Sequence, residues 1–256
     1  MIDNIEIQNL IKIARKAGNE ILRIYNDENA STVVDHKDDN SPLTLADKAS
    51  HKVIEEGLTK LYPNIPIISE EGNDISYETR KHWNTFWLVD PLDGTKEFIN
   101  RNGEFTVNIA LIENRRPVLG IVFTPVKNEV YYGSSSIGAF KIEGSDGPKT
   151  IIVNNTDENR VAVRSKSHAS IEEEALLKRY KVVDSISVGS SLKFCMVAEG
   201  KADIYYRHGP TMEWDTAAGQ AVVEAAGGKV YVETSSQMFT YNKENLLNTG
   251  FLCLGF

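Results

Sequence analysis

The chain has 256 residues, of which 41% are hydrophobic, and a formal net charge of −8 at pH 7. A chain of this length buries a sizeable core, as one large domain or as two subdomains. The acidic balance argues against binding to polymeric nucleic acid, which requires a basic surface. Because no apolar run approaches about 20 residues and no secretory segment is apparent, we expect a cytoplasmic protein with at most peripheral membrane contact. Cys195 and Cys253 lie in apolar surroundings and are expected to be reduced core thiols.

The first half of the sequence predicts two helices followed by strands. Apolar residues recur at helical spacing over residues 4–25, and a second helix is expected to start at Ser41–Thr44 and to end at Tyr62–Asn64. Residues 27–40 are expected to form a loop or loose hairpin, and residues 73–85 a polar loop. Strands are predicted over residues 66–69 and 86–89, and in an antiparallel meander over residues 105–112, 118–124, 129–133 and 138–142.

The second half alternates strands with helices, a pattern typical of layered α/β structure. Strands are predicted over residues 161–164, 182–188, 203–206, 229–232 and 248–254, and helices over residues 171–180, 191–199 and 215–226. The segment 144–159 is rich in turn residues and separates the two patterns. We therefore predict an N-terminal α+β subdomain over residues 1–150 and a C-terminal α/β subdomain over residues 151–256, joined in one integrated unit.

Two carboxylates lie close together after a predicted buried strand. The strand ends at Asp90, Pro91 has no N–H for the ladder, and Asp93 precedes a helix-like start at Gly94 and Thr95. Carboxylates at this spacing repel one another unless a cation lies between them, and oxygen ligands suit Mg²⁺. Helix-start amides beside the metal suit phosphate oxygens. The alternative is an ordinary turn in which an aspartate caps the next helix.

Four further acidic residues are candidates for the same site, and each has a structural alternative. Glu70 and Glu71 follow a strand, where open α/β sheets place their ligands, but they also fit a solvated acidic turn. Asp215 begins a helix rich in alanine and glycine that must pack closely against a neighbour, but it also fits an N-cap. Asp47 follows Thr44 by three residues, which fits either a capping box or a functional carboxylate.

A candidate anion pocket lies at the start of another predicted helix. Ser190 and Ser191 follow Gly189 at a strand end, and Lys193 lies one turn into the helix. Hydroxyl groups, helix amides and a lysine together suit a bound anion. The basic residues of the segment Arg164–His168 either add to this pocket or solvate a loop.

These motifs together resemble the inositol monophosphatase superfamily of Mg²⁺-dependent, lithium-sensitive phosphatases. The resemblance rests on Asp90–Thr95 (Asp-Pro-Leu-Asp-Gly-Thr) and Trp214–Gly219 (Trp-Asp-Thr-Ala-Ala-Gly), with Glu70 and Glu71 upstream. Within the superfamily, further stretches resemble the 3′(2′),5′-bisphosphate nucleotidases of bacterial type: Lys96–Ile99, Arg101–Ala110, Gly189–Phe194 and Gly209–Asp215. Inositol-phosphate members typically carry Thr-Asn in place of Lys96 and Glu97. The segment Arg164–His168 departs from the more usual Ser-Arg-Ser-His.

The resemblance implies a mixed α/β sugar-phosphatase fold, a five-layer α-β-α-β-α sandwich. It also implies hydrolysis of 3′-phosphoadenosine 5′-phosphate to AMP and phosphate, a clearing step beside sulfate assimilation, with two or three Mg²⁺ ions as cofactors. The partner is then a small nucleotide bisphosphate, and the protein is a monomer or a homodimer. Contact with the inner face of the cytoplasmic membrane is an expectation from bacterial relatives.

The resemblance also implies roles for individual residues. The metal ligands are Glu70, Asp90, the Leu92 carbonyl, Asp93 and Asp215. The Gly94 and Thr95 amides bind the scissile phosphate, and Asp47, Thr95 and Glu70 serve catalysis by activating the water. The substrate-binding set comprises Glu70, Leu92, Asp93, Gly94, Thr95, Ser190, Ser191, Lys193 and Asp215. Two alternatives stay open: the same chemistry on inositol monophosphate or a sugar bisphosphate, and a catalytically silent metal- or nucleotide-binding protein.

Overall fold

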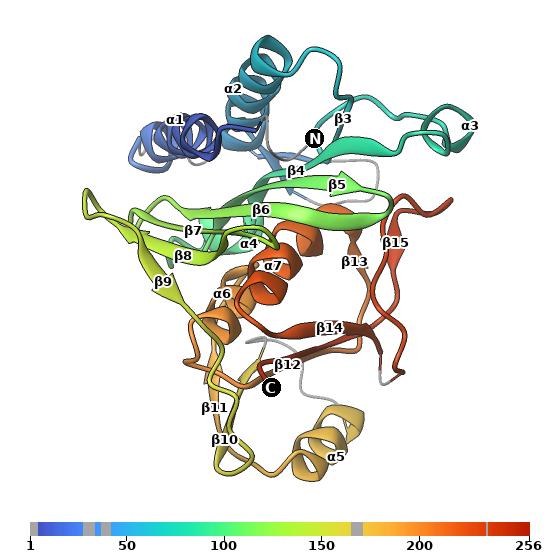
Figure 1. The fold of residues 1–256 in the computed structure, drawn as a ribbon. Helices are drawn as coiled ribbons and strands as arrows, with labels where there is room; N and C mark the ends of the chain where they lie inside the picture. The colour runs from blue at the N-terminus through green and yellow to red at the C-terminus, as the bar shows by residue number, and fades with distance from the viewer. Residues whose placement is uncertain (1–4, 28–33, 37–41, 165–170, 234) are drawn as a thin grey trace.

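The computed structural model describes residues 5–27, 34–36, 42–164, 171–233 and 235–256, and its elements stack in five layers (Figure 1). From one side to the other the layers are α1 (Ile7–Tyr25) with α2 (Leu45–Leu61), a seven-stranded sheet, α6 (Leu192–Ala198) with α7 (Glu213–Ala225), a five-stranded sheet, and α5 (Ile171–Arg179). This is the α-β-α-β-α order that the sequence predicted. Three separate clusters of buried apolar residues fill the spaces between the layers.

The seven-stranded sheet follows the chain order from edge to edge. Its strands are β3 (Ile67–Ser69), β4 (Thr85–Asp93), β5 (Thr106–Glu113), β6 (Arg116–Thr124), β7 (Glu129–Ser134), β8 (Gly138–Glu143) and β9 (Lys149–Ile151). All neighbours are antiparallel except β3 and β4. The β5–β6 hairpin turns at Asn114 and Arg115, whose φ values of 50° and 66° match the left-handed conformation that tight hairpin turns require. The meander is confirmed.

The five-stranded sheet is mixed and comes from the second half of the chain. In spatial order its strands are β11 (Val182–Ser187), β10 (Arg160–Arg164), β12 (Ile204–Arg207), β16 (Phe251–Leu254) and β14 (Lys229–Val232). Two small sheets pair β1 (Val34–His36) with β2 (Pro42–Thr44), and β13 (Thr211–Met212) with β15 (Leu247–Asn248). The remaining helices are α3 (Tyr77–Arg80) and α4 (Thr95–Ile99).

Three local expectations are corrected. Residues 42–44 form strand β2 and not the start of a helix, with Pro42 at the first strand position, where its missing N–H is tolerated. The expected loop 73–85 contains the short helix α3, whose cap is Ser76 with its side chain accepting a hydrogen bond from the Thr79 amide. The turn-rich segment 144–159 contains β9, which extends the first sheet. The subdomain boundary in that segment stays a prediction.

Helix α7 packs unusually close to the first sheet. An added Cβ at Gly120 of β6 would lie 2.3 Å from the Ala218 carbonyl oxygen, and one at Gly133 of β7 would lie 2.8 Å from Cβ of Ala225. The close packing predicted from the small residues of this helix is therefore confirmed. Helix α7 also contacts β4 and β5. It therefore lies against the strand that ends in the Asp90–Asp93 turn.

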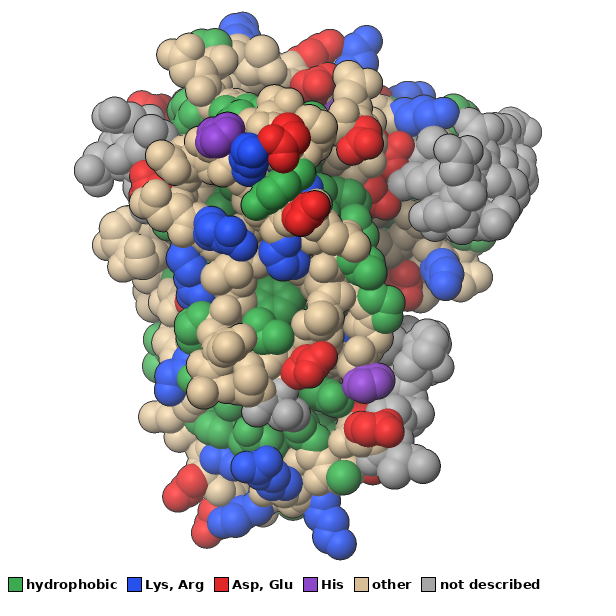
Figure 2. Space-filling view, turned by 90° about the vertical axis from the view of Figure 1, so that its right-hand side faces the viewer, with side chains coloured by type: hydrophobic (Ala, Val, Ile, Leu, Met, Phe, Trp, Pro, Cys, Tyr) green, Lys and Arg blue, Asp and Glu red, His purple; other side chains and the backbone are tan. Residues whose placement is uncertain are grey.

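The two cysteines are confirmed as free buried thiols, and both belong to the central core between the sheets. Among the described residues, no helix is both long enough and apolar enough to cross a membrane. On the side seen at the right of Figure 1, basic and acidic side chains are interspersed around a band of hydrophobic ones (Figure 2).

Replacing Gly120 by alanine should destabilise the protein, because the new methyl group meets backbone that cannot move aside. We expect a loss of about 1–3 kcal/mol in the free energy of unfolding, measured by urea titration. Gly147→Ala is the matched control, since its added methyl group meets no atom within 4 Å. A Gly120→Ala protein as stable as the control would contradict the packing.

Candidate active site

The turn between β4 and α4 is held from two sides. Pairing of β4 with β5 is interrupted between Asp90 and Asp93, as the proline between them predicts. The Leu92 amide donates to Asp90 Oδ1 at 3.1 Å, and Ser50 of α2 donates from its hydroxyl to the Pro91 carbonyl oxygen at 2.7 Å. The turn therefore leaves the sheet in a fixed conformation that keeps both carboxylates at its edge.

Asp90 is the centre of a cluster of acidic side chains. Its side chain is buried, and burial is the largest cause of a pKa well above the usual carboxyl value. The charges of the other predicted carboxylates raise the pKa further; these are Glu70, Asp93, Asp215 and Asp47. Four separate elements supply the five groups. The structure thus brings together five of the acidic candidates that the sequence suggested; Glu71 is not among the charges that raise the pKa of Asp90.

Asp93 and Asp215 share this environment but are each held by a backbone amide. Burial raises the pKa of Asp93 to about 6, against the opposing effects of the Lys193 charge and of the Ser191 amide, which donates to its Oδ2 at 2.5 Å. Burial and the Asp93 charge also raise the pKa of Asp215, whose Oδ2 accepts from the Met212 amide at 2.8 Å. Both carboxylates are therefore fixed in direction while their charges repel.

The two remaining acids, Glu70 and Asp47, come from the edge of the first sheet and from helix α2. The Glu70 amide donates to the Val89 carbonyl at 3.1 Å, which continues the pairing of β3 with β4 and sets Glu70 beside the strand that ends in Asp90. Asp47 lies buried in the first turn of α2. The side chain of Thr44 lies outside what the structure describes, so the capping box stays an open alternative.

The donor set fits Mg²⁺. In the described part of the chain, no three His, Cys, Asp or Glu side chains converge tightly enough to enclose an ion by themselves. Mg²⁺ does not need such a cage, because it keeps several waters and binds through a few carboxylates together with substrate phosphates. Buried carboxylates that raise one another's pKa are stabilised by a hard divalent cation. The Leu92 carbonyl as a ligand stays a prediction.

A cavity of about 210 Å³ adjoins the acidic cluster and joins the two halves of the chain. Its wall contains Asp93 and Gly94 from the β4–α4 turn and Asp215 from α7. The other lining residues are Lys96, Glu97, Gly189, Ser190, Ser191, Lys193, Phe194, Tyr205, Arg207, Thr211, Thr216 and Phe251. The residues of the predicted anion pocket, Ser190, Ser191 and Lys193, therefore line the same cavity as Asp93 and Asp215, two of the predicted metal ligands.

Ser191 is built into the wall of this cavity. Its hydroxyl lies 2.8 Å from Thr106 Oγ1 and donates to Asn108 Oδ1 at 2.8 Å, while its amide binds Asp93. Because the side chain is buried with partners on β5, the geometry favours a role in fixing Asp93 and leaves the hydroxyl committed to the protein.

Lys193 is a buried cation at the same cavity. Its Nζ donates to the carbonyl oxygens of Ser190 at 2.7 Å and Val188 at 3.2 Å. Burial lowers the pKa of Lys193 to about 8, and the Asp93 charge opposes that shift. The lysine therefore keeps a positive charge close to the acidic cluster at neutral pH.

Arg207 lines the cavity, although the sequence analysis did not single it out as a site residue. The sequence indicates a substrate-shaping loop over Arg207–Glu213 without giving Arg207 a role of its own, and its place at the end of strand β12 was the available signal. Within the described residues its buried Nε has no hydrogen-bond partner. By contrast, Arg164 pairs with Glu173 and Glu174 and does not line the cavity. Lys166 and His168, also considered for the pocket, lie outside the described residues.

The sequence matches the model of the Inositol monophosphatase family over residues 3–250. The chain belongs to this family. It is 46% identical over 245 residues to the 3′(2′),5′-bisphosphate nucleotidase CysQ of Shigella flexneri and to that of Escherichia coli K12, and each match covers 96% of this chain and 98% of the relative. The crystal structure of CysQ from Bacteroides thetaiotaomicron, with 43% identity, matches with a TM-score of 0.85 over 97% of this chain and 96% of that one. The resemblance proposed from the motifs is confirmed at the level of the family.

Removing one charge from the acidic cluster should stabilise the metal-free protein. We expect Asp90→Asn to raise the melting temperature in EDTA by about 3 °C or more, because a buried, repelled carboxylate is lost. Mg²⁺ should raise the melting temperature of the parent and have much less effect on the variant.

Asp157→Asn is the control, because this carboxylate is exposed. Differential scanning fluorimetry with and without Mg²⁺ measures all three proteins. Equal Mg²⁺ shifts in the parent and Asp90→Asn would argue against cation binding at the cluster.

Proposed function

We propose that this protein is a Mg²⁺-dependent phosphatase that hydrolyses the 3′-phosphate of 3′-phosphoadenosine 5′-phosphate to give AMP and phosphate. The observation that carries the proposal is the cavity whose wall holds Asp93 and Asp215 of the acidic cluster together with the basic side chains of Lys96, Lys193 and Arg207. The relationship to proteins named 3′(2′),5′-bisphosphate nucleotidase supports the choice of substrate. The proposed role is the clearing of this nucleotide beside sulfate assimilation.

The acidic cluster is assigned to the cofactor. Glu70, Asp90, Asp93 and Asp215, with the Leu92 carbonyl, would hold two or three Mg²⁺ ions. When bound, Mg²⁺ supplies positive charge that acidifies water and neutralises phosphate oxygens. Ions bound there would offset the repulsion between these carboxylates and a negatively charged substrate.

The water and the scissile phosphate are assigned to the β4–α4 turn. Gly94, whose φ is 94°, is the N-cap of α4. The first amides of a helix have no partner within the helix and point out of its N-terminal end. We assign these amides of Gly94 and Thr95 to the phosphate oxygens. We assign the Thr95 hydroxyl to orienting the attacking water, and the carboxylates of buried Asp47 and half-buried Glu70 to polarising that hydroxyl and taking up the proton that the water loses.

The basic residues of the cavity favour a substrate with two phosphates. Lys96, Lys193 and Arg207 all line it, in addition to the acidic cluster. One phosphate at the β4–α4 turn leaves these three cations to bind a second, and charge-assisted hydrogen bonds are the strong ones. An inositol monophosphate has only one phosphate to offer. This charge balance supports the nucleotide bisphosphate.

We expect phosphate release from 3′-phosphoadenosine 5′-phosphate in Mg²⁺ with at least tenfold higher kcat/KM than from inositol 1-phosphate. Tenfold corresponds to about 1.4 kcal/mol, less than a charged hydrogen bond to the second phosphate contributes. Lithium should inhibit the reaction. A malachite-green assay of free phosphate measures both substrates.

Asp93→Asn should lower kcat about 100-fold or more in that assay, because it removes a ligand of the cation that is proposed to stabilise transition-state charge. Asp184→Asn is the control on an exposed strand and should retain parental turnover. Preference for inositol 1-phosphate would keep the metal site and refute the substrate assignment. Turnover of neither substrate would favour a catalytically silent binding protein.

A further inference from the structure

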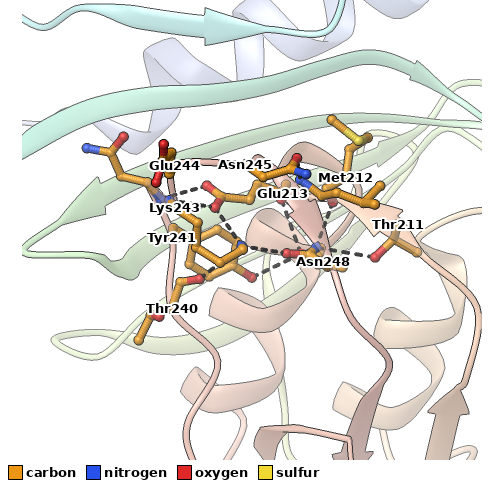
Figure 3. A network of polar contacts seen from close by, with 12 residues as sticks. Thr211, Met212, Glu213, Thr240, Tyr241, Lys243, Glu244, Asn245 and Asn248 are labelled. Carbon is orange, nitrogen blue, oxygen red and sulfur yellow. Dashed lines mark hydrogen bonds and ion pairs between the residues drawn. The ribbon is translucent and has the colours of Figure 1, made fainter. Parts of the chain in front are cut away.

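A fully buried carboxylate at the start of α7 does not line the cavity. Glu213 has 0% exposure and lies two residues before Asp215. Its Oε2 accepts from the Asn242 amide at 2.7 Å, and its Oε1 accepts from the Lys243 amide at 2.9 Å and from Lys243 Nζ at 2.6 Å (Figure 3). A buried carboxylate is tolerated only with such full pairing. All three donors come from one loop, residues 240–248.

The same loop returns to the wall of the cavity. Lys243 Nζ also donates to Asn248 Oδ1 at 2.8 Å. The Asn248 side-chain amide donates to the Met212 carbonyl at 2.9 Å and to the hydroxyls of Thr211 and Thr216, each at 3.2 Å (Figure 3). Thr211 and Thr216 line the cavity. The loop is therefore hydrogen-bonded to Glu213 and Thr216 in the first turn of α7, and to Thr211 and Met212 just before it.

The far side of the loop is fixed to the segment that follows Glu70. Arg80 at the end of α3 is buried, and its guanidinium donates to Asn242 Oδ1 at 2.9 Å and to the carbonyls of Lys243 at 2.6 Å and Glu244 at 2.7 Å. In return, the Asn242 side-chain amide donates to the Arg80 carbonyl at 2.7 Å. The loop thus lies between a segment that leaves the first sheet and a helix of the middle layer.

We propose that Glu213 is a positioning residue for the cation site, acting through loop 240–248 to hold Asp215 in register with the carboxylates of the first sheet. The inference rests on the proposed function, because that proposal makes Asp215 a metal ligand. Asp215 belongs to α7, which is packed between the sheets. Asp90 belongs to β4, and Glu70 directly follows β3. The loop is a polar connection between these two bodies of structure, through Arg80 on one side and Glu213 on the other. Groups that orient metal ligands typically change metal affinity about 10–100-fold when they are lost.

The test is Glu213→Gln, which keeps the shape of the side chain and removes its charge and one acceptor. Calorimetric titration of the metal-free protein with Mn²⁺ should show an affinity at least about tenfold weaker than that of the parent. The Mg²⁺ concentration for half-maximal phosphate release should rise by a similar factor. The KM for 3′-phosphoadenosine 5′-phosphate at saturating Mg²⁺ should change less than threefold, because Glu213 does not touch the cavity.

Two further variants separate positioning from general stability. Lys243→Met removes the cation of the same network and should weaken Mn²⁺ binding in the same direction. Glu224→Gln, on the same helix as Glu213, weakens a partly buried ion pair with Arg116 of β6 at 2.8 Å. It should lower the melting temperature and leave the Mn²⁺ affinity unchanged.

Parental Mn²⁺ affinity in both Glu213→Gln and Lys243→Met would overturn the inference while leaving the proposed function intact. Equal weakening in Glu224→Gln would also overturn it, because the effect would then follow stability alone. If the parent itself bound no Mn²⁺ and released no phosphate, the proposed function would fail, and the inference with it.

Discussion

Repulsion between buried carboxylates is the constraint on which the rest of this structure depends. Asp90 lies inside the protein with four acidic neighbours whose charges, together with burial, raise its pKa well above the usual carboxyl value. Such a cluster is unfavourable unless a cation compensates it. The fold nevertheless fixes these groups with amide and hydroxyl donors, as the Ser191 amide fixes Asp93 and the Met212 amide fixes Asp215. The cation site proposed here would compensate the repulsion that this arrangement creates.

Two sheets and the helices between them deliver the groups to one place. The first sheet supplies Glu70 and the Asp90–Asp93 turn at strand ends, and the close approach of α7 to Gly120 brings Asp215 to the same edge. The second half of the chain supplies Lys193 and Arg207 to the same cavity. The cavity wall therefore carries side chains of both signs where the two halves of the chain meet.

Local patterns were sufficient to predict most of this arrangement, and long-range contacts account for what they missed. Pro91 signalled the break in the ladder, and the small residues after Asp215 signalled a closely packed helix; both follow from the chemistry of the residues themselves. Strand β13 and the partners of Glu213 were not predicted, because they exist only when loop 240–248 folds back on α7. Likewise, the sequence presented Ser191 as a substrate hydroxyl, and only the structure shows it bonded to Asn108.

The most direct measurement is anomalous diffraction from crystals of this protein soaked with Mn²⁺ in place of Mg²⁺, because Mn²⁺ takes the same oxygen ligands. The account predicts at least one anomalous peak within about 2.5 Å of carboxylate oxygens from both Asp90 and Asp93, and occupancy that falls in the Asp90→Asn protein. A map with no peak among Glu70, Asp90, Asp93 and Asp215 at saturating Mn²⁺ would contradict the central claim.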